Sequence, residues 1–511
     1  RWHADPMVSG DEVEPEWLED GTRFWYRNKV REGHEFVLVD PDGPERRPLF
    51  DRHRLAAVLS RADDTAYVGT DLPFDDFDFV EEPVRIEFQA RKKRFECDIV
   101  DYTCAVGDTL PSDRPYVESP DERWEAFVVE HDLWIRPSGG SGDSVRVTTD
   151  GEELWSYGLG YPRPNQLREE EVRRPNVRWS PDSRRLAVER DDEREVEHHH
   201  YLSMTPQRPV HYSYPYALPG DSIIPFPGIH VLTLEVPDEK EEDALPSVVS
   251  NVAVEFPERP LQSSFSGSLP DSAWSDDART LYVTSTNRAY KDMWLGAVDA
   301  DDGSFRVLAH EEGKTYVEMS HGSRLTPASW YVFENGDVLW WSQRDGWAHL
   351  YLLGTDGEEK AQLTSGPWMV EHVRHVDEEA GYIYFTARGR EPGNPYHAYL
   401  YRMGTDGSGL TRITAEEGHH DVTLSPDGRW LVDQVSDIGR APVTRLRSLP
   451  GGQESMGLEE ADVSRLMEEL GFRPAEVFTV KARDGVTDLH GLLYLPPDLD
   501  PSMEYPVISH I

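Results

Sequence analysis

The sequence predicts an all-β protein, a seven- or eight-bladed β-propeller followed by the first strands of an α/β domain. Three observations lead to this fold class. A turn-and-strand repeat recurs through most of the chain, helical periodicity is sparse before residue 459, and the pattern changes after Leu470. At 511 residues the chain is too long for one ordinary core, so a repeat architecture or several domains are expected.

Each copy of the repeat begins with a Ser/Thr-Pro-Asp-type turn and continues into an apolar strand and a second strand. Pro fixes the first turn position, Asp accepts hydrogen bonds from the backbone ahead of it, and Gly takes the position with positive φ. One four-stranded sheet cannot bury both of its faces, so the copies are expected to stack around an axis. The clearest copies lie at 118–129, 179–188, 274–283 and 424–432, with weaker ones at 334–341 and 378–385 and a first one at 23–40.

The last fifty residues follow a different pattern. Residues 459–470 carry apolar side chains at helical spacing, and Gly471 is placed to end a helix. Segments 477–480 and 489–495 are predicted to pair as strands, and 505–511 reads as a further apolar strand. We therefore expect a propeller over 1–457, a connecting helix over 458–475 and the truncated start of a second domain over 476–511.

The net charge of −44 limits the kinds of molecule that the chain is expected to bind. A surface this acidic repels phosphate, which argues against nucleic acid and anionic membranes. We interpret the charge as adaptation to a salt-rich cytosol, where counterions screen the repulsion between carboxylates. No apolar run is long enough to span a membrane.

Cysteine usage bears on the compartment. With only Cys97 and Cys104 there is no disulfide framework, which favours a reducing compartment and a cytoplasmic location. One local bridge between the two stays possible. The sequence begins at Arg1 and not at Met, so a preceding signal segment also stays possible.

An ordered set of segments resembles the propeller of dipeptidyl peptidase IV-like enzymes, in the prolyl oligopeptidase family of serine peptidases. The resemblance extends over roughly residues 20–511 and ends in segments similar to the start of that family's α/β-hydrolase domain. The segments that carry it are 147–151, 179–183, 216–221, 341–352, 362–370, 382–387, 410–414, 425–428, 478–480 and 505–508.

The resemblance implies peptide hydrolysis by a Ser-Asp-His triad whose serine lies in a Gly-x-Ser-x-Gly turn. That pattern is absent from the sequence. The nearest stretch, Gly139–Asp143, has Asp143 where the second glycine is required. We therefore expect the catalytic residues beyond Ile511 and expect the chain alone to be inactive. No cofactor and no metal are expected.

In this family the propeller admits short peptides and supplies carboxylates that bind the substrate's α-ammonium group. By resemblance, the candidates are Glu169, Glu170 and Glu171. A glutamate run in so acidic a chain is also typical of a solvated surface, and a broader oligopeptidase would then be favoured. Arg324 and Arg344 are candidates for holding a substrate carbonyl, although such arginines often pair with propeller carboxylates.

The histidine run His198-His199-His200 invites a metal interpretation. Adjacent strand residues point to opposite faces, so the three cannot easily chelate one ion, and we expect structural or interface roles. His419-His420 is discounted in the same way. Trp340, Trp341 and Trp347 are expected in the core of a blade.

Two functional hypotheses remain. The chain is either the substrate-gating propeller of a serine exopeptidase that releases dipeptides, or a catalytically silent propeller used for binding or assembly. The expected partners are short peptide substrates and the chain's own missing hydrolase domain, and a homodimer is possible.

Overall fold

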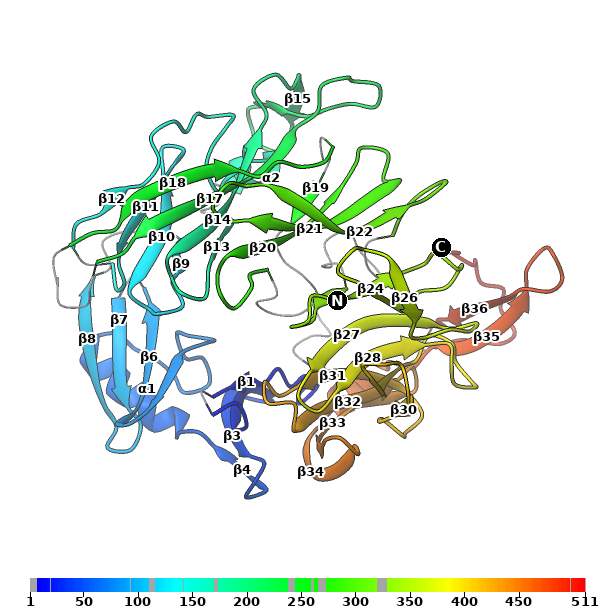
Figure 1. Ribbon diagram of the computed structural model, residues 1–511. Coiled ribbons are helices and arrows are strands. Elements are labelled where there is room, and N and C mark those ends of the chain that lie inside the picture. The colour runs from blue at the N-terminus through cyan, green and yellow to red at the C-terminus, as the bar shows by residue number, and fades with distance from the viewer. Residues whose placement is uncertain are drawn as a thin grey trace. The chain divides into compact units, whose positions relative to one another are not determined.

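The structure is a computed structural model of the chain (Figure 1). It describes residues 7–18, 20–91, 93–109, 115–140, 142–169, 173–237, 244–258, 262–264, 273–318, 329–496 and 498–510. Within these residues eight four-stranded sheets follow one another along the chain. The fold is therefore the expected β-propeller, with eight blades.

The backbone divides into two compact units, which we describe separately. The first comprises Arg1–Gly107, Glu391–Arg402 and Leu410–Ile511. Its sheets are, in order, β1 (Glu16–Trp17), β2 (Phe24–Val30), β3 (Gly33–Asp40) and β4 (Glu45–Pro48); β5 (Asp78–Glu81), β6 (Val84–Ala90), β7 (Lys93–Asp98) and β8 (Thr103–Thr109); and β31 (His419–Leu424), β32 (Trp430–Asp437), β33 (Arg440–Ser448) and β34 (Gln453–Glu460).

Aromatic side chains form the core of this unit. Trp25 stacks on Phe77 with ring centroids 4.2 Å apart, in a cluster that joins the first two sheets and helix α1 (Arg52–Ala62). A second cluster contains Phe24 from β2 and Trp430 from β32, so the first sheet of the chain packs against the last. This contact between the two ends of the repeat is what a propeller requires.

The second unit comprises Asp108–Arg390 and Met403–Gly409. Its sheets are β9 (Val117–Glu118), β10 (Trp124–Val129), β11 (Asp132–Pro137) and β12 (Val145–Arg146); β13 (Val177–Trp179), β14 (Arg185–Asp192), β17 (Phe226–Glu235) and β18 (Ser247–Ala253); β19 (Gln262–Ser264), β20 (Thr280–Thr286), β21 (Asp292–Asp299) and β22 (Phe305–Glu312); and β23 (Trp330–Val332), β24 (Val338–Ser342), β25 (His349–Leu353) and β26 (Glu359–Gln362).

The remaining four-stranded sheet consists of β27 (Met369–Asp377), β28 (Tyr382–Arg388), β29 (Ala398–Gly404) and β30 (Thr411–Arg412). Two further features interrupt the series of sheets. The short helix α2 (Pro164–Glu169) precedes β13, and a two-stranded hairpin, β15 (His198–Ser203) and β16 (Val210–Pro215), is inserted between β14 and β17. Figure 1 shows this hairpin beyond the end of its parent sheet.

The repeated turn has the chemistry that the sequence predicts. Asp182 accepts a hydrogen bond from the Arg184 amide at 3.1 Å, and the Ser180 hydroxyl accepts one from the Arg185 amide at 2.9 Å. Equivalent bonds surround Asp121, Asp277 and Asp427. In these four turns the position with positive φ is a glycine at Gly428, whereas Glu122, Ser183 and Ala278 occupy it in the other three, with φ of 56°, 57° and 58°.

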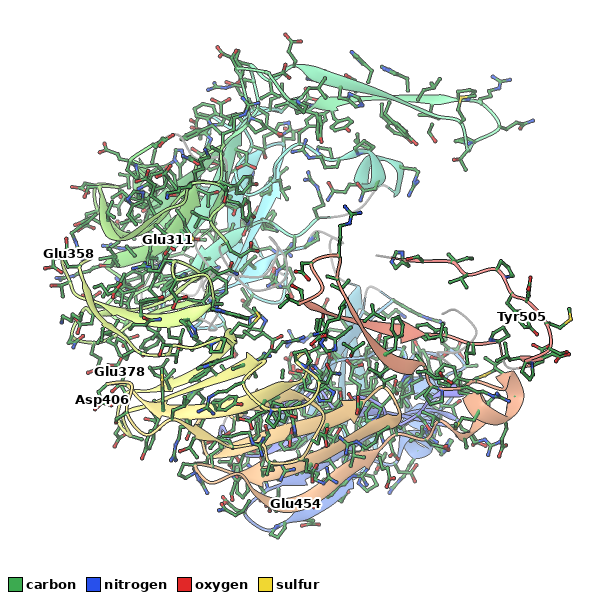
Figure 2. All side chains as sticks on the ribbon, turned by 90° about the vertical axis from the view of Figure 1, so that its right-hand side faces the viewer. Glu311, Glu358, Glu378, Asp406, Glu454 and Tyr505 are labelled. Carbon is green, nitrogen blue, oxygen red and sulfur yellow. A yellow bond between two sulfur atoms is a disulfide. The ribbon has the colours of Figure 1, made fainter. Side chains whose placement is uncertain are left out.

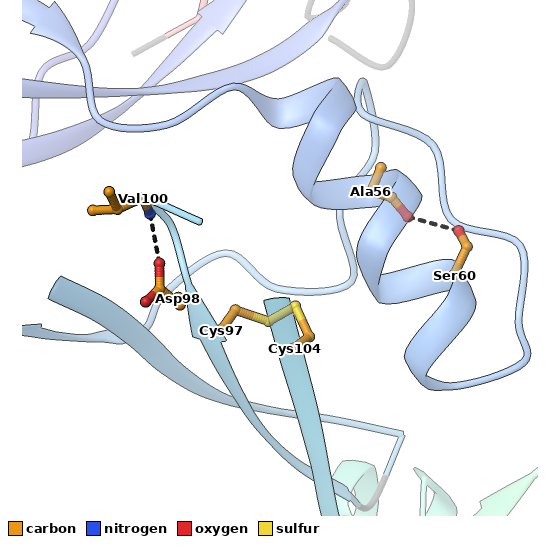
Figure 3. Close-up of a disulfide and its surroundings, with 6 residues drawn as sticks. All are labelled: Ala56, Ser60, Cys97, Asp98, Val100 and Cys104. Atoms are coloured by element: carbon orange, nitrogen blue, oxygen red, sulfur yellow. Dashed lines mark hydrogen bonds between the residues drawn. A yellow bond between two sulfur atoms is a disulfide. The ribbon is translucent and has the colours of Figure 1, made fainter. Parts of the chain in front are cut away.

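The two cysteines form the one local bridge that the sequence left open. Cys97 on β7 and Cys104 on β8 are joined by a disulfide, with Cα atoms 4.1 Å apart (Figure 3). Asp98 accepts a 2.8 Å hydrogen bond from the Val100 amide inside the closed loop, which shapes the turn between the two strands.

Three expectations about local structure were wrong. The helix predicted over 459–470 is α3 (Ser464–Leu470), because Glu459 and Glu460 still pair with β33 as the end of β34. Gly471 does end the helix, with φ 61°. Trp347 is 46% exposed, since it lies in the turn between β24 and β25 and not in a strand.

The third wrong expectation concerns the C-terminal segment. The predicted pairing of two strands is confirmed by β35 (Glu476–Lys481) and β36 (Asp488–Leu493). The segment 505–511 was predicted as a strand, but its described residues 505–510 pair with no strand in the described part of the chain, and Ile508 is 92% exposed. Figure 2 shows Tyr505 on this segment, away from the sheets. None of the described helices has the length and apolarity to cross a membrane.

Candidate functional site

Strand β14 carries acidic side chains at alternate positions. Glu189 and Asp191 belong to the strand and Glu193 follows it directly, so the period of two directs the two strand carboxylates to one side. Arg190 points to the other side, where its guanidinium lies 3.4 Å from the centre of the Trp155 ring. The acidic side is therefore separated from the nearest arginine of its own strand.

A loop, described over residues 158–169 and 173–176, begins and ends beside the middle of β14. The Gly158 amide donates to the Glu189 carbonyl at 2.6 Å, and the Asn176 amide donates to the Gly158 carbonyl at 2.8 Å. The Glu189 amide in turn donates to the Asn176 carbonyl at 3.2 Å. Helix α2 lies within this loop, so the backbone of β14 fixes both ends of the segment that carries the helix.

Glu193 fixes the middle of the same loop. Its carboxylate accepts a 2.9 Å hydrogen bond from the Tyr161 amide and a 3.0 Å bond from the Arg163 guanidinium. Arg163 also donates to the Pro215 carbonyl at the base of the β15–β16 hairpin, at 2.7 Å. Glu193 is buried, and these charge-assisted bonds compensate its desolvation.

The other two carboxyl groups are less well compensated. Burial, together with the charge of Asp191, raises the pKa of Glu189 to about 8, against the opposing hydrogen bond from Asn176. Burial, together with the charge of Glu193, raises the pKa of Asp191 to about 7, against the opposing charge of Arg163. The Oδ1 atom of Asp191 is buried and has no hydrogen-bond partner among the described residues.

Little space separates Asp191 from the loop. A side-chain carbon placed on Gly160 would lie 3.3 Å from Asp191 Oδ2 and 4.0 Å from Glu193 Oε2. The absence of a side chain at residue 160 thus allows the α2 loop to approach both carboxylates closely.

Chemically, this arrangement favours a cation. Three carboxyl groups lie near the Arg163 guanidinium, and the Arg173 guanidinium donates to the neighbouring Gly160 carbonyl at 2.7 Å. A buried negative charge is stable only when it is paired, protonated or bound to a cation. No three His, Cys, Asp or Glu side chains in the described residues are arranged to hold a metal ion. An organic ammonium group, with three N–H donors, suits the unpartnered oxygen better.

The amine-binding residues suggested by the sequence lie next to this cluster in the chain. Glu169 is the last residue of α2, and nothing is described of its side chain. Glu170 and Glu171 lie outside the described residues. Their proposed role is therefore not tested directly, but the short helix beside them and its attachment to β14 are present.

The carbonyl-binding candidates are placed differently. Arg324 lies outside the described residues. Arg344 follows β24, and its guanidinium donates to Glu311 at 2.9 Å and to Glu359 at 3.1 Å, while lying 4.6 Å from the centre of the Tyr351 ring. This is the pairing with propeller carboxylates that the sequence offered as the alternative.

Sequence reasoning missed Glu189, Asp191 and Glu193. The available signal was the alternation of acidic residues directly after the apolar run Leu186-Ala187-Val188, which places carboxylates on a continuing strand. In a chain with 96 acidic residues this alternation is easily taken for the polar end of a strand.

A second hollow, of about 600 Å³, lies beside Asp192 at the end of β14. Its apolar lining includes Ile224 and Phe256, and its carboxylates include Glu195 and Glu255. Glu255 lines this hollow and is not part of the β14 cluster, so it provides a control position for experiments on that cluster.

Comparison with known proteins places the chain in a family. Residues 109–442 match the model of the dipeptidyl peptidase IV N-terminal region. Dipeptidyl-aminopeptidase B of Emericella nidulans, named as probable, is 26% identical over 421 residues, or 77% of this chain and 43% of the relative. Dipeptidyl peptidase 4 of Trichophyton rubrum is 24% identical over 414 residues, or 76% of this chain and 48% of the relative.

The chain thus spans less than half the length of these two curated relatives. Among solved structures, Porphyromonas gingivalis dipeptidyl peptidase 4 superposes with a TM-score of 0.66 at 20% identity, covering 98% of this chain and 66% of that protein. This likeness supports the fold. The extent of the family match shows that the chain belongs to the dipeptidyl peptidase IV family, whose N-terminal region it contains.

Proposed function

We propose that this chain is the substrate-gating and N-terminus-recognising propeller of a serine exopeptidase that releases dipeptides from peptide N-termini. The observation that carries the proposal is the buried, unpartnered Oδ1 of Asp191 beside the α2 loop. The α-ammonium group of a substrate would neutralise this carboxylate cluster. The distance between the bound ammonium group and the scissile bond would then set the length of the released product.

Glu189 and Asp191 act together with Glu169, Glu170 and Glu171 in this proposal. In this proposal the strand carboxylates and the glutamate run both supply negative charge to the amine of the substrate. Glu193 is a positioning residue, because its contacts are with Tyr161 and Arg163 of the loop. The Arg324 and Arg344 side chains remain proposed hydrogen-bond donors to a substrate carbonyl.

The second domain is proposed from the exposed apolar residues of the C-terminal hairpin. Val477, Phe478 and Val480 of β35 are between 43% and 55% exposed, although strands of this composition normally pack against a partner. The chain's own hydrolase domain is the occupant that the family suggests, and it would carry the nucleophile. Because the sequence contains no Gly-x-Ser-x-Gly, we expect the chain alone to show no turnover of X-Pro amides.

The ammonium site is tested by binding. We expect the peptide Ala-Pro-Ala to bind the chain in calorimetry and its N-acetylated form to bind at least about tenfold more weakly, the loss of one charge-assisted contact. Asp191→Asn and Glu189→Gln should reduce this difference, while Glu255→Gln, in the second hollow, should leave it unchanged.

The outcomes separate the alternatives. Equal binding of both peptides would contradict dipeptidyl specificity and favour a broader oligopeptidase. Binding of neither peptide would favour the silent binding or assembly module. Affinity should increase between pH 6 and 8.5, as Asp191, with its pKa raised to about 7, and then Glu189, with its pKa raised to about 8, lose their protons.

The cytoplasmic location is also a proposal. Disulfides such as Cys97–Cys104 persist mainly in oxidising compartments, whereas two cysteines in all are typical of a reducing one. Alkylation of the protein in intact cells distinguishes these settings. Free thiols at both positions would support the cytoplasm, and their protection from alkylation would contradict it.

A further inference from the structure

The β15–β16 hairpin has two chemically different faces. The register pairs His199 with Tyr214, and both side chains lie on one face, where their ring centroids are 5.8 Å apart. His198, His200 and His211 lie on the other face, since His200 pairs with Ser213 and His211 with Leu202. Figure 1 shows the hairpin projecting from its sheet, and the three side chains on the second face are exposed.

Two imidazoles meet on that second face. The Nδ1 atom of His200 lies 3.2 Å from Nε2 of His211, and the rings are stacked with centroids 5.2 Å apart. With neutral rings, one of these nitrogens carries the proton that the other accepts. Moving that proton to the outer nitrogen of the same ring leaves one lone pair on each of the two neighbouring nitrogens, with no net change in protonation.

The separation of the two nitrogens is the one that a chelated ion requires. Two imidazole nitrogens bound to zinc at tetrahedral geometry, with bonds of roughly 2.0–2.1 Å, are about 3.3 Å apart. We propose that His200 Nδ1 and His211 Nε2 form a site for a borderline divalent cation, Zn²⁺ or Cu²⁺, with water in the remaining positions. Imidazole ligands select such ions over Mg²⁺ and Ca²⁺, which prefer oxygen.

The strand alternation that argued against chelation by three consecutive histidines still holds. The alternation places His199 on the face opposite to its two neighbours. It does not apply to His211, which lies on the other strand of the hairpin, eleven positions from His200, and is brought next to it by the strand pairing. His198 lies on the same face as His200, but its Nδ1 is 2.9 Å from the Ser213 hydroxyl and it is not counted among the ligands.

The site is tested by titrating the chain with Zn²⁺ in calorimetry, with Mg²⁺ as the hard-ion comparison. We expect one equivalent of Zn²⁺ to bind and Mg²⁺ not to bind. His200→Ala and His211→Ala should each weaken Zn²⁺ binding at least about tenfold, since a single imidazole ligand remains. His199→Ala, on the opposite face of the same strand, is the matched control and should bind as the original chain does.

A spectroscopic measurement makes the test independent of hairpin stability. Cu²⁺ bound to the original chain should show coupling to two nitrogens in electron paramagnetic resonance, and His211→Gln should reduce the coupling to one. Unchanged coupling in His211→Gln, or an equal loss of Zn²⁺ affinity in His199→Ala, would overturn the proposal.

Discussion

The Tyr26 hydroxyl donates a 2.6 Å hydrogen bond to Glu459 Oε1, which joins β2 of the first sheet to β34 of the last. Tyr26 is fully buried, and its hydroxyl also accepts a 2.9 Å bond from Arg46 Nε. Burial and the neighbouring carboxylate raise the pKa of Tyr26 well above its ordinary value, so the hydroxyl keeps the proton that it donates. One polar contact thus accompanies the apolar contact between the ends of the repeat.

We expect Tyr26→Phe to lower the free energy of unfolding by about 1–2 kcal/mol, because Glu459, whose side chain is 12% exposed, and Arg46 each lose a partner. Urea denaturation followed by tryptophan fluorescence measures the change. Tyr494→Phe is the control, since that side chain is 68% exposed in the C-terminal segment. An equal effect of the two substitutions would show that the bond contributes nothing to holding the two sheets together.

The repeated turn provides a second test. Glu122 is exposed and has φ 56°, a conformation that costs most residues with a Cβ atom about 1 kcal/mol relative to glycine. We expect Glu122→Gly to be neutral or stabilising by up to about 1 kcal/mol. Gly428→Ala, at the equivalent position of another blade with φ 67°, should destabilise by about the same amount. Destabilisation by both changes would contradict the strain argument.

The disulfide should contribute to stability through the unfolded state. It closes a loop with a sequence separation of 7, for which the loss of chain entropy corresponds to roughly 2 kcal/mol. We expect the double variant Cys97→Ala/Cys104→Ala to lose about that much in urea denaturation, and the original chain to lose a similar amount when a reducing agent is added. If reductant does not affect the original chain, the thiols are not paired in solution.

The sequence predicted the repeat because its turns are local: Ser180, Asp182 and the strand after them contact one another within six residues. It failed where long-range contacts decide. Helix α1 was overlooked although Asp51 accepts bonds from the His53 and Arg54 amides and Leu55 and Leu59 are buried. Those two leucines become core residues only because neighbouring sheets cover them.

The same limit applies to the candidate site. The glutamate run 169–171 was visible in the sequence as a motif. Glu189 and Asp191 are separated from it by a strand and a loop. The hydrogen bonds at Gly158 and Asn176 bring that loop to β14, and only these contacts identify the strand carboxylates as site candidates. The C-terminal helix was placed too early because Glu459 has a good helical neighbourhood in sequence, yet pairs with Thr444 as a strand. Pairing across the sheet cannot be read from local periodicity.

The net charge of −44 predicts a strong dependence of stability on salt. Salt shortens the Debye length from about 10 Å at 0.1 M to about 3 Å at 1 M, so repulsion between surface carboxylates decreases in the folded state. We expect the melting temperature to increase by several degrees between 0.1 M and 1 M KCl. Sucrose of matched osmolality is the control, and an equal increase in sucrose would indicate solvent exclusion in place of charge screening.

The raised pKa values of Glu189 and Asp191 predict the direction of a pH dependence. Because both groups bind protons more tightly in the folded state than in the unfolded chain, their contribution to stability is present below about pH 4 and is lost as the pH rises through the folded values of about 8 and about 7. We therefore expect the free energy of unfolding to decrease by about 1–3 kcal/mol between pH 5 and pH 8 in low salt.

The substitutions Glu189→Gln and Asp191→Asn should each flatten this slope, since an amide does not titrate, while Glu255→Gln should leave it unchanged. Denaturation in urea at several pH values measures all four proteins. A saturating peptide with a free amino terminus should flatten the slope in the original chain as well, because its ammonium group stabilises the ionised carboxylates. A slope that the peptide leaves unaltered would show that the cluster is a structural feature and not the place where the amine binds.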